Sequence, residues 1–75
     1  MQPVEYRMTL NNWAQANKKE ICWETFTSGA AHAPVWTAVV VIDSEYSRAD
    51  GKTLGSAKEE AARKALQVIE SLEQQ

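Results

Sequence analysis

The chain has 75 residues, 44% of them hydrophobic, and a formal net charge of -2, which corresponds to one small domain near the lower size limit for folding without a metal or disulfides. Its single cysteine, Cys22, excludes an internal disulfide and a cysteine-based zinc site, and a lone thiol is typical of a cytoplasmic or nuclear protein. No apolar run approaches the roughly 20 residues that span a membrane, so we expect neither a membrane segment nor a secretory signal.

The first predicted element is a helix over residues 7–17, preceded by a flexible arm over residues 1–6 that contains a proline. Leu10, Trp13 and Ala14 recur at spacings of three and four and form an apolar stripe. The opposite side carries one methionine and three amides: Met8, Asn11, Asn12 and Gln15. Because solvated helix faces are normally rich in charge, this side is either a set of tolerated surface residues or a contact face.

A strand is predicted over residues 21–27, which are rich in β-branched and aromatic side chains. If Glu24 faces water, three side chains of this strand face the core: Ile21, Trp23 and Thr25. A loop of small residues follows over residues 28–34 and carries His32, the one histidine of the chain. The loop is either an ordinary hairpin connection or a device that holds an imidazole towards a partner.

The second predicted strand, residues 35–42, is apolar on both faces. One face carries Trp36, Ala38, Val40 and Ile42, and the other carries Val35, Thr37, Val39 and Val41. Because a chain this short can hardly cover both faces, we expect Val39 and Val41 to be partly exposed on the outer face of a small sheet. Either neighbouring strands cover them laterally, or they form a contact surface for another protein. A weaker third strand over residues 45–50 pairs back antiparallel.

The last predicted element is a helix that Thr53 or Ser56 can cap. Its apolar stripe consists of Ala57, Ala61, Ala65, Val68, Ile69 and Leu72. The alanines allow close packing of its first half. Two ion pairs at i,i+4 spacing are expected on its surface, Glu59 with Arg63 and Glu60 with Lys64. The element order predicts an α+β fold, an α-β-β-β-α two-layer sandwich with two helices on one face of a three-stranded antiparallel sheet, as one domain over residues 7–73.

Enzymatic chemistry is not expected from these residues. Cys22 and His32 lack a third group that would orient the imidazole, and one His and one Cys make no transition-metal site. We therefore predict a non-catalytic protein without a cofactor or a metal. The stretch Gly51-Lys52-Thr53 lacks the upstream glycine of a phosphate-binding loop. With Lys52 and Lys58 beside a helix N-terminus, it can nevertheless seat a phosphate.

Three segments in this order resemble the double-stranded RNA-binding domain family, over residues 8–72. They are Leu10-Asn11-Asn12-Trp13-Ala14-Gln15, Gly29-Ala30-Ala31-His32-Ala33-Pro34-Val35-Trp36, and Ala57-Lys58 with Ala61-Ala62-Arg63-Lys64-Ala65-Leu66. The middle segment is similar to the family pattern Gly-Pro-x-His-x-Pro-x-Phe, with Ala30 in place of its first proline and Trp36 in place of its Phe.

The resemblance implies that double-stranded RNA is the partner, bound through three contact regions that read A-form shape. In the first region, Met8, Asn11, Asn12 and Gln15 would meet 2′-hydroxyls and base edges in one minor groove. In the second, His32 and the backbone around Ala31 would reach ribose in the next minor groove. In the third, Lys52 and Lys58 would sit over phosphates.

The third region departs from the family pattern Lys-Lys-x-Ala-Lys. The matching positions are Leu54, Gly55, Ser56, Ala57 and Lys58, so two of three lysines are missing. Together with the net charge of -2, this predicts weakened RNA affinity. The alternative is a protein-interaction or homodimerisation module on the same fold, with Val39 and Val41 on its contact surface.

Overall fold

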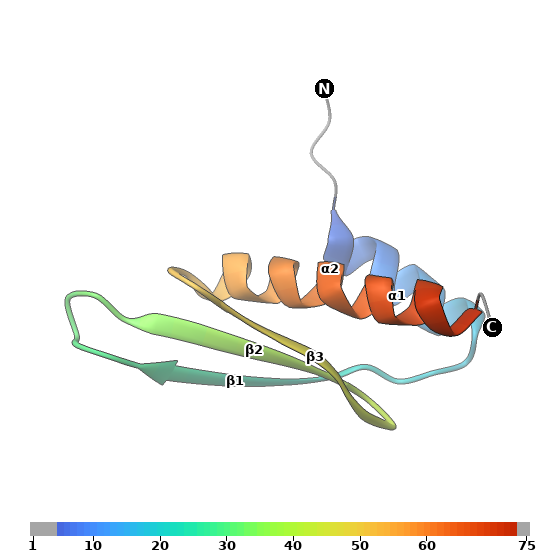
Figure 1. Cartoon of the computed structure of the whole chain (residues 1–75), viewed down its shortest axis with the longest axis horizontal. Coiled ribbons are helices and arrows are strands. Elements are labelled where there is room, and N and C mark those ends of the chain that lie inside the picture. Colours follow the sequence, from blue (N-terminus) through green and yellow to red (C-terminus); the bar gives the residue numbers. More distant parts are fainter. Residues whose placement is uncertain (1–4, 74–75) are drawn as a thin grey trace.

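The computed structural model describes residues 5–73, and it contains the five elements that the sequence predicts. Helix α1 (Tyr6–Ala16) is followed by three strands and helix α2; their bounds are β1 (Cys22–Ser28), β2 (Val35–Ile42), β3 (Ser44–Gly51) and α2 (Leu54–Glu73). The predicted order and the α-β-β-β-α class are confirmed (Figure 1). Residues 1–4 of the expected arm lie outside the described residues, and Tyr6, the last arm residue, already begins α1.

The three strands form one antiparallel sheet in the order β1-β2-β3, and both helices cover the same face of it (Figure 1). The strands β2 and β3 are joined through Asp43 alone, whose φ of 67° places it in the left-handed region that a tight connection requires. A bulge between Val40 and Val41 leaves Tyr46 as the extra residue of β3. Because register fixes the faces, Ala38, Val40 and Ile42 point to the helices, and Val39 and Val41 to the outer face.

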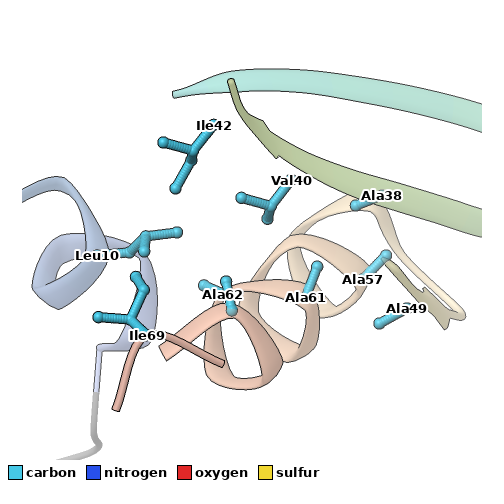
Figure 2. Packing of buried hydrophobic residues seen from close by; sticks show 10 residues of the cluster. Leu10, Ala38, Val40, Ile42, Ala49, Ala57, Ala61, Ala62 and Ile69 are labelled. Carbon is cyan, nitrogen blue, oxygen red and sulfur yellow. The ribbon is translucent and has the colours of Figure 1, made fainter. Parts of the chain in front are cut away.

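The core changes in width along the helix-covered face of the sheet (Figure 2). At one end, which we call the α1 end, Leu10 of α1 meets Ile42 and Ile69. At the other end, which we call the alanine end, the core consists of Ala38, Ala49, Ala57 and Ala61. Alanine side chains let two backbones approach closely, so α2 lies nearest to the sheet where it begins.

The expectation that Val39 is partly exposed on the outer face of the sheet is wrong, because its side chain is only 1% exposed. Its cross-strand neighbours are Glu24 and Arg48, whose stems lie on the same face and can shield it laterally. Val41 is half-buried. The exposed apolar side chains of the outer face are instead Phe26, at 52%, and Val35, at 40%.

Several side chains of the predicted faces are placed differently. Thr25 is exposed although it shares the helix-covered face with Trp23, and Cys22 is exposed at the start of β1. In α2 the predicted stripe fails at its end, where Val68 and Leu72 are exposed, while Ala62 is buried instead. Val68 and Leu72 instead line a surface groove between α2 and β3, opposite Tyr46 and Arg48.

Candidate nucleic-acid interface

The uncharged side of α1 faces solvent. Met8 is 56% exposed, and Asn11, Asn12 and Gln15 are exposed beside it. The opposite stripe is inside, with Leu10 and Ala14 buried and Trp13 half-buried. The helix therefore presents a row of amide donors and acceptors without any ion pair among them.

The start of α1 is fixed by a carboxylate from α2. The backbone N–H groups of Tyr6 and Arg7 donate to Oε1 of Glu59, the second over 3.2 Å, and Nε of Arg7 donates to Oε2 over 2.9 Å. The first N–H groups of a helix have no partner within it and favour negative charge. Glu5, the residue before α1, supplies no side-chain cap. Glu59 thus fixes the position of α1 relative to α2, and the predicted pair of Glu59 with Arg63 is wrong.

The loop between β1 and β2 is an ordered turn with the imidazole outside. The N–H of Ala33 donates to the carbonyl of Ala30 over 2.9 Å, so residues 30–33 form a turn around His32. Gly29 has a φ of 88°, and a Cβ there would lie 3.2 Å from the carbonyl oxygen of Ala33. Only glycine adopts this backbone without strain. The loop therefore holds His32 and the backbone around Ala31 in solvent.

The start of α2 is closed by a reciprocal cap. The N–H of Ser56 donates to Oγ1 of Thr53 over 3.1 Å, and the N–H of Thr53 donates to Oγ of Ser56 over 3.3 Å. Both predicted capping residues thus act in one motif, with Thr53 as the N-cap. Gly51 pairs with Trp36, so Lys52 and the cap lie at the end of the sheet that carries the His32 loop (Figure 1).

Two lysines flank this cap in different environments. Lys52 is exposed, whereas Lys58 is half-buried, with Nζ lying over the ring of Trp23, 5.8 Å from the ring centre. The two positions that carry lysine in the family pattern hold a half-buried Leu54 and an exposed Gly55. The positive charge of this region therefore comes from Lys52 and Lys58.

Two ion pairs, Glu60–Arg63 and Glu45–Arg48, lie outside these three regions. The guanidinium of Arg63 accounts for the lowered pKa of Glu60, and that of Arg48 for the lowered pKa of Glu45, in both cases mainly by hydrogen bonding to the carboxylate. The pair Glu60–Arg63 replaces the predicted pair Glu60–Lys64. Lys64 instead directs Nζ to the backbone carbonyl of Arg48 at 3.4 Å.

Two further findings concern residues 5–73 only. In that range no three histidine, cysteine, aspartate or glutamate side chains come close enough together to hold a metal ion. Neither helix found there has the length and apolar character needed to cross a membrane.

The fold agrees with comparisons to known proteins. The model of the double-stranded RNA binding motif family matches residues 6–69, and the chain belongs to this family. It is also similar to a solution structure of both double-stranded RNA-binding domains of DRB4 with their linker, at 30% identity and a TM-score of 0.75. The match covers 91% of this chain and 46% of that one. The comparison with curated protein sequences finds no match.

Proposed function

We propose that the chain is a non-catalytic module that binds double-stranded RNA by the shape of its A-form helix, with weakened affinity. The observation that carries the proposal is that, in a chain of this family, the residues of all three expected contact regions reach the surface. The amides of α1 are exposed, His32 stands on an ordered turn, and α2 begins with a closed cap beside Lys52.

The chemistry of each region suits a different part of the duplex. A-form RNA has a wide, shallow minor groove that displays 2′-hydroxyls, and each hydroxyl both donates and accepts a hydrogen bond. The amides of Asn11, Asn12 and Gln15 also do both, so they match 2′-hydroxyls without reading sequence. The turn around His32 offers an imidazole and backbone groups to a second minor groove. Lys52 and Lys58 offer charge to the phosphates between the two grooves.

The weakness of the binding follows from the start of α2. Leu54 and Gly55 contribute no charge where the family pattern has lysine, and each lost phosphate contact removes roughly one unit from the salt dependence of affinity. The net charge of -2 adds repulsion at long range. We expect binding that is measurable at low salt and lost at lower salt concentrations than for a fully basic member of the family.

A titration with three nucleic acids of matched sequence tests the proposal. The ligands are an RNA duplex of about 20 base pairs, which exceeds the roughly 16 that such a domain spans, the DNA duplex of the same sequence, and one RNA strand. We expect the RNA duplex to bind and the other two to bind much more weakly at the same salt concentration. Equal affinity for RNA and DNA duplexes would overturn recognition by shape.

Single substitutions test the contact regions. We expect Lys58→Ala and His32→Ala each to weaken RNA binding by about tenfold, as for the loss of a contact worth roughly 1–3 kcal/mol, and Lys58→Ala alone to reduce the salt slope by about one unit. Lys64→Ala is the matched control, because it removes the same charge from a lysine directed to the carbonyl of Arg48. An equal loss in Lys64→Ala would mean that net charge, and not the contact regions, governs the binding.

The second candidate is homodimerisation through the outer face of the sheet. Val39 is buried and Val41 half-buried, so the observation that favours it is the exposure of Phe26 and Val35 on that face. A measurement of molar mass against concentration tests it, with Phe26→Asp expected to turn dimers into monomers. A monomer at all concentrations would remove this candidate.

A further inference from the structure

Trp23 lies on the helix-covered face of β1, half-buried, and packs against the core. Its register partner on β2 is Val40, which is fully buried. The ring has a second neighbour above it, because Nζ of Lys58 stands 5.8 Å from the ring centre. Lys58 belongs to the second turn of α2, directly before Glu59, which fixes the start of α1.

We infer that Trp23 is a positioning residue for RNA binding, which holds the ammonium group of Lys58 where a phosphate of the duplex is met. The inference rests on the proposed function. The face of an indole ring attracts a cation within about 6 Å of its centre, more strongly than the rings of Tyr or Phe. A cation held in this way keeps its N–H donors on the side away from the ring, where they can meet a phosphate oxygen.

The contact with Trp23 favours RNA binding because it restricts the side chain of Lys58 before the RNA arrives. A free lysine side chain carries considerable rotamer entropy, and its immobilisation at an interface weakens binding. Because the aromatic contact restricts Lys58 before RNA arrives, less of that loss remains for the binding step. The effect matters here because Leu54 and Gly55 occupy the other lysine positions of the pattern, so one restricted lysine carries a large share of the phosphate contact.

The alternative role of Trp23 is packing alone, and the two roles differ in their coupling to Lys58. If Trp23 acts through Lys58, its removal matters only while Lys58 is present. If Trp23 only supports the fold, its removal weakens RNA binding equally with and without Lys58. A double-mutant cycle separates the two roles, since it measures the interaction of two side chains apart from their individual effects.

The experiment is a titration of the RNA duplex of about 20 base pairs with the 75-residue chain and four variants: Trp23→Leu, Trp23→Phe, Lys58→Ala, and Trp23→Leu with Lys58→Ala. We expect Trp23→Leu to raise the Kd by about two- to fivefold, Trp23→Phe to recover part of the loss, and the double variant to bind like Lys58→Ala alone. Thermal midpoints are measured for all variants, and the titration is run below the lowest of them.

Each outcome decides one question. Failure of the unaltered chain to bind the duplex overturns the proposed function. Binding that Trp23→Leu leaves unchanged overturns the inference and leaves the proposed function standing. A loss in Trp23→Leu that is equal in the Lys58→Ala background also overturns the inference, since the ring would then act through packing. If Trp23→Leu does not fold, the same cycle with Trp23→Phe decides, with a smaller loss expected that Lys58→Ala abolishes.

Discussion

The two ends of the core differ in the size of the side chains that fill them, and the difference decides where the binding surface can form. The α1 end contains Leu10, Ile42 and Ile69, and it leaves room for a second helix beside α2. The alanine end has no such filling, and α2 approaches the sheet so closely that a Cβ on Gly51 would lie 2.8 Å from the N atom of Ala57. Large core side chains thus position α1, whereas small ones position the start of α2.

Because of this difference, the two helices are disturbed by different kinds of substitution. At the alanine end any added volume pushes α2 away from β3, and with it the cap and both lysines that flank it. The position of α1 depends in addition on a polar side-chain contact, that of Glu59 with the first turn of α1. The start of α2 is therefore sensitive to the size of a side chain, and the start of α1 to the loss of a carboxylate.

The largest effect is expected from a larger side chain at the alanine end. Ala61→Leu adds volume at a fully buried position whose carbonyl also accepts a hydrogen bond from Ser47 Oγ over 2.7 Å. We expect a loss of about 1–3 kcal/mol in the free energy of unfolding, because overpacked cores strain their surroundings. Chemical denaturation measures it. Val68→Leu, at an exposed position of the same helix, should change stability by less than about 0.5 kcal/mol, and equal losses would break the comparison.

Two glycines, Gly51 at the end of β3 and Gly55 in the first turn of α2, provide a matched pair with opposite expected effects on stability. Gly51→Ala forces its Cβ against the backbone of Ala57, whereas a Cβ on Gly55 meets nothing within 4 Å. We expect Gly51→Ala to destabilise the fold by about 1–3 kcal/mol, and Gly55→Ala to stabilise it by about 0.5 kcal/mol, because alanine restricts the unfolded chain and favours helix. Thermal and urea unfolding of both variants test this, and stabilisation by Gly51→Ala would contradict the close approach.

The removal of a carboxylate tests what fixes the start of α1. Glu59→Ala removes the acceptor of two backbone N–H groups of α1, and we expect a loss of about 1 kcal/mol, as for other helix caps. Relative to the unaltered chain, the variant should show faster amide hydrogen exchange in the first turn of α1 and unchanged exchange in α2. Glu60→Ala, beside it in sequence but paired with Arg63 of the same helix, is the control. Faster exchange throughout the molecule would mean that Glu59 supports the whole fold and not α1 in particular.

The smallest effect concerns pH. Hydrogen bonding to Arg63 lowers the pKa of Glu60 below its ordinary value of 4.5, so the folded state binds this proton less readily than the unfolded state. The contribution is present in full above pH 4.5 and is lost as pH falls through the lowered folded pKa. We expect Glu60→Gln to lower stability slightly at pH 7, where the contribution is present, and to make stability less dependent on pH below that value. An unchanged acid transition would show that the pair contributes nothing.

The sequence predicts what depends on local pattern. The stripe of Leu10, Trp13 and Ala14 marks the inner side of α1, and the bounds predicted for β2 agree with the structure. Pairings between distant residues were not predictable in this way. Nothing near Glu59 in sequence indicates that its partner is Arg7, because the local spacing to Arg63 is equally suitable for an ion pair. Val39 was expected to be partly exposed, because alternation assigns a face but does not decide whether neighbours such as Glu24 and Arg48 cover it laterally.

The contact of Glu59 with α1 also bears on the order in which the domain can assemble. Helix α1 has 11 residues, and isolated helices shorter than about 12–15 residues are marginal in water. Its first turn finds its acceptor 52 residues further along the chain, so α1 is synthesised well before the residue that fixes its start. A fragment that ends after β3 would contain every amide of the first contact region, yet it would lack the residue that holds them in a helix.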